Sequence, residues 1–269
     1  MKTSFLIPTR ERKEMLEKSI LSIMETADDP SEIELLLGVD NDDQETADYV
    51  ANELPKVLEG YNNDTKVLKF NPLGYGKLHE YVNALCGYAS GDYLVLWNDD
   101  CILQTKGWDT LLSEQEDKFA VFKMNQINHP HPYALFPIVP IDWYLLIGYF
   151  SLNAQNDAWV STIAKALNVL KPIDIDILHD RFDLTGNNDD DTFRNRVYKE
   201  GNPSDPEDFQ HPNMTKAREH CMHKLSWFCG KIGQPETQEY FNKVLTNEVN
   251  PYEEWQEERK NAKGVGSGL

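Results

Sequence analysis

The sequence is short of positive charge. Its 269 residues include 26 Lys and Arg against 45 Asp and Glu, which gives a formal net charge of −19. A surface with this imbalance repels the phosphate backbone of nucleic acids and anionic lipid headgroups unless a local basic patch opposes it. Nucleic acid is therefore unlikely as a partner on charge grounds.

Long uninterrupted hydrophobic runs are also missing. The longest apolar stretch, residues 134–150, is broken by Pro137, Pro140 and Asp142, whereas a membrane helix needs about 20 consecutive apolar residues. We expect no membrane span. Residues 1–4 lead directly into a strand-like run and do not have the pattern of a signal peptide. The expected compartment is the cytoplasm.

Two further absences narrow the chemistry. The chain has four cysteines, and without a secretory signal such a chain is expected to keep reduced thiols rather than a disulfide framework. No glycine-rich phosphate-binding loop with a basic residue follows the first expected strand, which argues against a nucleotidyltransferase.

The first hundred residues alternate regularly between strand-like and helix-like segments. Apolar runs predict strands at 3–8, 33–39, 67–70 and 93–97. Helical spacing predicts helices at 12–25, 45–58 and 78–89, the second kinked or ended by Pro55. This alternation predicts an α/β fold with a mostly parallel sheet flanked by helices.

The rest of the chain is less regular. Its patterns predict helices near 109–116 and 156–170, strands near 119–124 and 173–178, and two helices at 215–230 and 237–244. Residues 187–212 are rich in Asp, Asn and Pro and are expected to form a loop or linker. We therefore expect a domain over residues 1–186 and a linker with a helical C-terminal extension over residues 187–269.

The motif Asn98-Asp99-Asp100 directly follows the expected strand at 93–97. Ligands collect at the carboxyl ends of strands in α/β proteins. Adjacent carboxylates repel each other unless a cation offsets their charge, and a divalent metal with a diphosphate ligand is the usual solution. An acidic turn without a function is the alternative interpretation.

Four segments follow one another along the chain: Ser4 to Arg10, Asn71-Pro72-Leu73-Gly74, Ala89 to Tyr93, and Asn98-Asp99-Asp100. In this order they resemble the motifs of GT-A fold glycosyltransferases, most closely family 2, with Asn98-Asp99-Asp100 at the position of the DXD motif. It covers about residues 3–180 and implies a Rossmann-like GT-A sheet. It also implies a nucleotide-diphosphate sugar as donor, with a UDP-sugar expected first, a divalent ion such as Mn²⁺ or Mg²⁺, and a hydroxyl acceptor.

The resemblance also assigns roles to residues of the expected donor site. It implies contacts to the nucleotide sugar from these residues: Pro8, Thr9, Arg10, Asp40, Asp42, Gly74, Lys77, Asn98 and Asp99. Alternatives without a role in binding stay open: a solvated turn for Thr9 and Arg10, a helix N-cap for Asp42 and Asp43, and a surface lysine for Lys77. Asn98 departs from the usual Asp of the motif, which makes Asp99 a possible second metal ligand.

Catalysis and metal binding are expected farther along the chain. Gly148-Tyr149-Phe150 followed by Asn156-Asp157 resembles the family's segment that supplies the catalytic base, so Asp157 is the expected base of an inverting transfer. Helix capping is its alternative role. The resemblance implies Asp100 and His179 as metal ligands, with Asp180 and Asp183 as alternates.

The combined expectation is a metal-dependent inverting glycosyltransferase. Two rivals stay open at this point. One is a retaining GT-A glycosyltransferase, and the other is a catalytically silent module that binds a nucleotide or carbohydrate.

Overall fold

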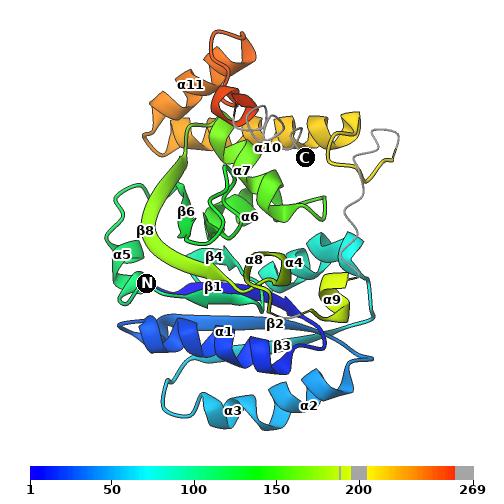
Figure 1. Ribbon diagram of the computed structural model, residues 1–269. Coiled ribbons are helices and arrows are strands. Elements are labelled where there is room, and N and C mark those ends of the chain that lie inside the picture. The colour runs from blue at the N-terminus through cyan, green and yellow to red at the C-terminus, as the bar shows by residue number, and fades with distance from the viewer. Residues whose placement is uncertain (188, 195–204, 258–269) are drawn as a thin grey trace.

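The structure is a computed structural model that describes residues 1–187, 189–194 and 205–257. Its centre is an eight-stranded sheet in the order β3-β2-β1-β4-β7-β6-β8-β5 (Figure 1). The strands are β1 Thr3–Thr9, β2 Ile33–Asp40, β3 Asp64–Phe70, β4 Tyr93–Leu96, β5 Cys101–Leu103, β6 Val121–Gln126, β7 Pro137–Pro140 and β8 Leu170–His179.

Helices cover both faces of this sheet (Figure 1). They are α1 Lys13–Thr26, α2 Gln44–Asn52, α3 Leu54–Val57, α4 Leu78–Cys86, α5 Trp108–Ser113, α6 Ile141–Ile147, α7 Asn156–Ala166, α8 Phe182–Thr185, α9 Asp191–Arg194, α10 Pro212–Lys231 and α11 Pro235–Leu245. Two 3-10 turns, η1 Pro30–Glu32 and η2 Tyr75–Lys77, precede β2 and α4.

The sheet is parallel in its N-terminal half and mixed in the other. Strands β3, β2, β1 and β4 run parallel, as the alternating pattern predicts. Strand β7 is antiparallel to both β4 and β6, and β5 is antiparallel to β8, while β6 and β8 are parallel. The expected α/β fold with a mostly parallel sheet is confirmed, and β7 and β5 add antiparallel pairings to it.

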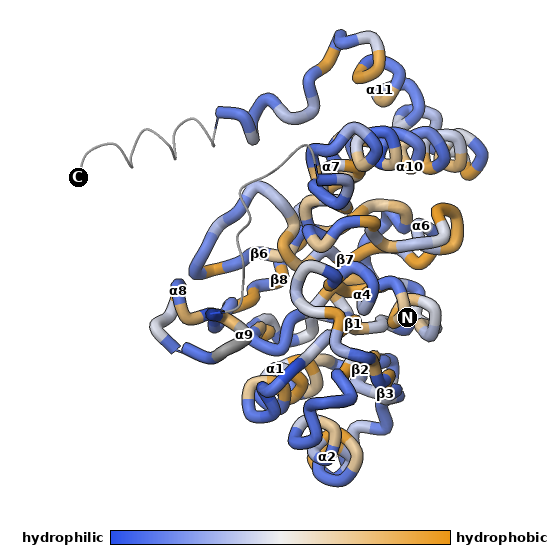
Figure 2. Tube along the Cα trace, turned by 90° about the vertical axis from the view of Figure 1, so that its right-hand side faces the viewer, coloured by the Kyte–Doolittle hydropathy of each residue, from blue (hydrophilic) through white to orange (hydrophobic). Residues whose placement is uncertain are grey.

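Successive side chains of the central strands point to opposite faces of the sheet, so the core has one layer on each face. Phe5 and Ile7 of β1 pack with α1 on one face, and Leu6 packs with α4 on the other. Strand β2 is buried along its whole length, which explains its nearly continuous apolar sequence. The same division appears in Figure 2, where hydrophobic residues concentrate on the strands and on the helix faces turned toward them.

Several expected boundaries differ from the observed ones. The helix predicted over 45–58 is broken after α2, and Pro55 lies in the first turn of α3. The helix predicted over 156–170 ends at Ala166, because Asn168 adopts a left-handed backbone (φ 58°) before β8 begins. The segment 134–150 contains strand β7 and helix α6, which the sequence pattern did not separate.

The C-terminal helices join the second core layer. Cys221, Leu225 and Cys229 of α10 are fully buried in the same cluster as Trp159 of α7. All four cysteines are free thiols. Among the described residues, no helix combines the length and the hydrophobicity that crossing a membrane requires.

A buried carboxylate ties together the edge of the sheet where β1 and β4 begin. Glu34 of β2 accepts hydrogen bonds from Ser4 Oγ (2.5 Å), Lys66 Nζ (2.5 Å) and Ser90 N (2.8 Å). Gly91 lies directly against this group, since a Cβ there would sit 2.7 Å from Ser4 Oγ. Only glycine allows this close approach.

Replacing Glu34 by glutamine is expected to make the free energy of unfolding depend less on pH in the acidic range. Burial alone would raise the pKa of Glu34, but hydrogen bonds from Lys66, Ser4 and Ser90 outweigh it and lower the pKa from 4.5 to about 2. Because the pKa of Glu34 is lower in the folded state than in the unfolded state, its carboxylate stabilises the fold at pH values above 4.5. This contribution, about 3 kcal/mol, is lost as the pH falls from 4.5 toward 2.

Urea unfolding across this pH window measures the effect. Glu34→Gln should be less stable than the parent at neutral pH and should lose less stability on acidification. The exposed Glu59 offers a control, and Glu59→Gln should follow the parent. A Glu34→Gln curve parallel to that of the parent would contradict the assignment.

Candidate nucleotide and metal site

The candidate site lies where β1 and β4 end. These strands are parallel neighbours with Leu6 opposite Leu96, so the residues that follow them emerge together. Thr9 Oγ1 donates a hydrogen bond to Asp99 Oδ2 (2.8 Å), and both side chains are buried. Thr9 is therefore part of the site rather than of a solvated turn.

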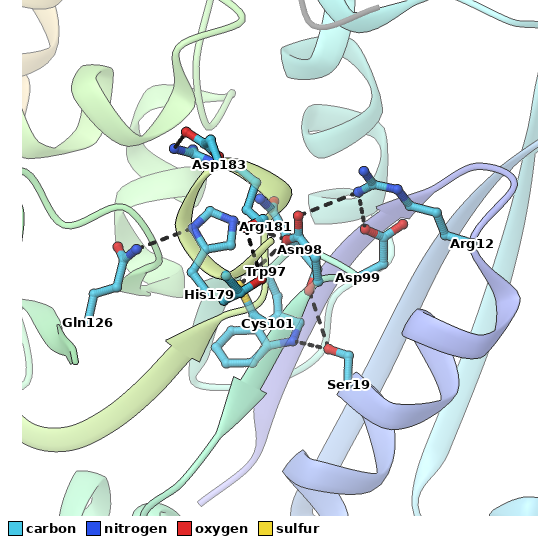
Figure 3. A network of polar contacts seen from close by, with 12 residues as sticks. Arg12, Ser19, Trp97, Asn98, Asp99, Cys101, Gln126, His179, Arg181 and Asp183 are labelled. Carbon is cyan, nitrogen blue, oxygen red and sulfur yellow. Dashed lines mark hydrogen bonds and ion pairs between the residues drawn. The ribbon is translucent and has the colours of Figure 1, made fainter. Parts of the chain in front are cut away.

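Arg12, which the sequence analysis did not single out, is the central cation of this site (Figure 3). Its Nη1 lies 3.0 Å from Asp99 Oδ1 and 3.5 Å from Asp100 Oδ2. Its Nε and Nη2 donate to the two carboxylate oxygens of Asp190 at 2.7 and 2.8 Å. One guanidinium thus connects the acidic motif to the segment between α8 and α9.

Burial and charge act against each other on these groups. Burial raises the pKa of Asp99, the charge of Arg12 lowers it, and the charge of Asp100 raises it again, with a net increase over the ordinary value. Burial also lowers the pKa of Arg12, but Asp190, Asp99 and Asp100 raise it beyond its usual value. Arg12 therefore remains a permanent positive charge beside the motif.

Asp100 and His179 meet at the same edge of the sheet. The antiparallel pairing of β5 and β8 places Cys101 opposite His179, the last residue of β8. His179 Nε2 lies 3.1 Å from Asp100 Oδ1. Ligand atoms of Asp100, Cys101 and His179 all lie within 4.8 Å of one another, and all three residues are buried.

The surroundings of His179 fit a metal ligand. Its buried Nε2 has the Asp100 carboxylate 3.1 Å away but makes no well-directed hydrogen bond to the described residues, and Gln126 Oε1 also lacks a hydrogen bond there. Gln126 Nε2 lies 3.3 Å from His179 Nδ1. Turning the Gln126 amide over would let Oε1 accept from Nδ1–H and leave the Nε2 lone pair toward Asp100, as a metal-bound imidazole requires.

The backbone of His179 is fixed as well. Asn128 Nδ2 donates to His179 O (2.8 Å), and His179 N donates to Asn128 Oδ1 (3.2 Å). The backbone nitrogen of Asp180 donates to Asp100 O (2.7 Å). An imidazole nitrogen and a carboxylate oxygen at this separation could both bind one divalent ion.

A second network lies at the end of β2. Asp40 accepts hydrogen bonds from Arg10 Nη1 (2.9 Å) and Tyr81 Oη (2.6 Å). Arg10 also donates to both carboxylate oxygens of Asp42, at 2.5 and 3.1 Å. The arrangement brings Arg10, Asp40 and Asp42 together as expected, and it adds Tyr81, which the sequence analysis missed.

Glu11 separates the two arginines. It adopts a left-handed backbone (φ 57°), which is uncommon for a residue with a side chain, and its backbone nitrogen donates to Asp43 Oδ2 (2.6 Å). Arg10 therefore reaches the Asp40 network while Arg12 reaches Asp99. Asp43, rather than Asp42, is the N-cap of α2 and accepts from Thr46 N.

The other expected residues lie around these networks. Pro8 is opposite Gly38 in the β1–β2 register, and Gly74 has a left-handed φ of 76° immediately before η2. Asn98 uses its backbone oxygen to accept from Ser19 Oγ (3.3 Å). Lys77 forms ion pairs with Glu80 and Glu207.

Asp157 lies in the first turn of α7. The N-cap of this helix is Gln155, and no side chain caps it by a hydrogen bond. Asp157 is therefore not the cap, although a carboxylate in a first turn is favoured by the helix dipole. Of the alternates to His179, Asp183 pairs with Arg181.

Comparisons with known proteins agree with this geometry. The sequence model described as Glycosyl transferase family 2 matches residues 4–164. No curated protein matches the sequence.

Two solved structures resemble the whole described fold. Staphylococcus aureus TarS 1–349 in complex with UDP-GlcNAc has a TM-score of 0.57 at 13% identity, covering 100% of this chain and 77% of that chain. The mannosyltransferase PcManGT from Pyrobaculum calidifontis, in complex with GDP-Man and Mn²⁺, has a TM-score of 0.54 at 9% identity, covering 99% and 81%. Alignments to TarS 1–349 alone and with UDP span only 58% of that chain. The likenesses to TarS with UDP-GlcNAc and to PcManGT establish a GT-A type fold.

Proposed function

Because the chain belongs to glycosyl transferase family 2, we propose that it transfers a sugar from a nucleotide-diphosphate donor to an acceptor hydroxyl, with inversion and with a divalent ion. The observation that carries the proposal is the buried pair of Asp100 Oδ1 and His179 Nε2, 3.1 Å apart. Mn²⁺ or Mg²⁺ is the ion we propose there. When bound, the ion supplies Lewis-acid stabilisation of the negative charge that grows on the departing diphosphate.

The donor nucleoside is held at the ends of β1 and β2. We assign it to the network in which Arg10 and Tyr81 fix the Asp40 carboxylate, with Pro8, Thr9, Asp42, Gly74, Lys77, Asn98 and Asp99 around it. TarS is known with UDP-GlcNAc and PcManGT with GDP-Man. These complexes support a nucleotide sugar as donor, and we favour a UDP-sugar. Arg12 adds a fixed positive charge beside the diphosphate position.

The proton of the acceptor hydroxyl goes to Asp157. A carboxylate next to the attacking hydroxyl removes its proton as the oxygen attacks the anomeric carbon on the side opposite the leaving group. This displacement inverts the configuration of the sugar. We also propose that residues 1–186 carry this chemistry and that residues 187–269 are a linker and extension, of which the described helices α10 and α11 pack on the domain.

A nucleotide-release assay with UDP-GlcNAc and GDP-mannose tests the proposal. We expect turnover with Mn²⁺ or Mg²⁺ and none with excess chelator, and proton NMR of the product should show an inverted anomeric centre. Retention would favour the retaining alternative. Donor binding with no turnover on any acceptor would favour a silent binding module.

Replacing Asp100 by asparagine is expected to weaken Mn²⁺ binding by at least about 10-fold, because the amide removes the negative charge that faces His179. Electron paramagnetic resonance of free Mn²⁺ measures the affinity without any turnover. The exposed Asp92 is a control, and Asp92→Asn should bind Mn²⁺ like the parent. Equal affinity in the Asp100→Asn protein would exclude Asp100 as a ligand.

A further inference from the structure

A pocket of about 350 Å³ opens beside the candidate metal pair, between β6 and the loop that leads into β7. It falls in the size range of small-molecule sites. One wall is polar and comes from the strand, and the other carries rings and comes from the loop. Their main members are Lys123, Asn125 and Gln126 on the strand, and His131, Tyr133 and Phe136 on the loop.

The pocket shares a wall with the metal pair. Gln126 lines it and places its Nε2 3.3 Å from His179 Nδ1. Phe136 also lines it, and its ring meets the His179 imidazole edge to face with 5.0 Å between centroids. A ligand seated here therefore lies one side chain away from the position proposed for the diphosphate.

An irregularity in β6 builds the polar wall. The pairing of β6 with β8 shifts register between Lys123 and Asn125. Consecutive side chains of a regular strand point to opposite faces, but four consecutive residues, 123–126, line this one pocket. Such bulges re-aim side chains and are frequent beside active sites.

The C-terminal segment holds the ring wall in place. The Tyr133 ring packs edge to face on Trp255, with 4.6 Å between centroids. Trp255 is buried, and its neighbour Tyr252 donates from Oη to Thr162 O of α7 (3.1 Å). The loop that closes the pocket is thus anchored from both α7 and the end of the described chain.

The chemistry of the two walls identifies a class of ligand. None of the described residues that line it is acidic, although the chain has 45 Asp and Glu. Rings offer a flat apolar surface, and the amides and the ammonium group offer hydrogen bonds to hydroxyl groups. A pyranose presents the same two features, an apolar C–H face and a rim of hydroxyls. We propose that this pocket binds the acceptor of the transfer and that this acceptor is a carbohydrate, an inference that rests on the proposed function.

Saturation-transfer NMR with phenyl β-glucopyranoside, in the presence of UDP and Mn²⁺, tests the proposal. We expect saturation of the pyranose C–H protons with the parent protein and its loss with Tyr133→Ala, which removes the ring wall. Asn125→Leu should also lose it while keeping the loop intact, because Asn125 is exposed and its side chain donates to Asp176 Oδ1 of β8 (3.2 Å). Tyr88→Ala, at an exposed tyrosine outside the pocket, is the matched control and should retain the signal.

UDP and Mn²⁺ binding by thermal shift is measured in the same samples. Retained UDP binding with pyranose saturation unchanged by both pocket variants would overturn the pocket and leave the donor site standing. Saturation confined to the phenyl protons would overturn the carbohydrate class. Absence of UDP binding by the parent would instead count against the proposed function itself.

Discussion

Replacing Asp157 by asparagine is expected to slow sugar transfer by about 100- to 10,000-fold, the range over which a positioned general base acts. The amide is nearly the same size and keeps the first turn of α7 intact, but it cannot take the acceptor proton. Donor binding should not change, because the residues assigned to the nucleotide lie at the ends of β1, β2 and β4 and around η2 rather than on α7. The decisive measurements are kcat for transfer and the thermal shift produced by the donor.

Asp142 provides a matched control for this experiment. It is the second residue of α6, as Asp157 is the second residue of α7. Both replacements therefore remove one carboxylate from a first helical turn and have the same effect on the helix dipole. Asp142→Asn should transfer sugar at the parental rate. A parental rate in Asp157→Asn would remove it as the base, and equal losses in both variants would indicate an effect on helix stability.

Replacing Arg12 by methionine is expected to destabilise the protein by about 3–5 kcal/mol, the usual result of removing one partner from a buried ion pair. Asp99 and Asp100 are both buried and adjacent, and Arg12 lies within 3.5 Å of each. Without its charge, two carboxylates face each other in a site with little water. Urea unfolding at neutral pH measures the loss.

Two further variants show whether charge is the cause. Adding Asp99→Asn to Arg12→Met should restore part of the stability, because it removes one of the two repelling carboxylates. Lys13 is the next residue, and its ion pair with Glu45 is exposed at the helix start, so Lys13→Met should change stability little. If Arg12→Met is as stable as Lys13→Met, the guanidinium does not offset the acidic motif.

The parallel half of the fold was predictable mainly because β1, β2 and β4 are buried along almost their whole length. Residues 33–39 are almost entirely apolar, and β2 is buried from end to end. Strands β5 and β7 have three and four residues, and β7 begins and ends with proline. Segments this short carry too few residues for a periodic pattern to mark them as strands.

Some residues of the candidate site could also be predicted from the sequence, and others could not. Asp100 and His179 could be named because a motif order and a strand end indicated them. Arg12 could not, since it stands in the charged run Arg10-Glu11-Arg12-Lys13, which looks like a solvated helix start. Gln126 was missed because its contact with His179 depends on how β6 and β8 pair across the sheet. Lys77 remains a predicted donor contact, and its ion pair with Glu207 could not be predicted because the two residues are 130 positions apart.

Gly91 affects the geometry of the candidate site although it lies at the other end of the strands that form it. It is near the beginning of β4, while Thr9 and Asp99 meet beyond the opposite ends of β1 and β4. A methyl group at residue 91 would collide with Ser4 and wedge the two strands apart at their amino ends. A displacement at one end of paired strands is carried along them to the other end. We therefore expect even alanine at residue 91 to shift the Thr9 hydroxyl away from the Asp99 carboxylate. The geometry of the Thr9–Asp99 contact thus depends on the absence of a side chain at the opposite end of the same two strands.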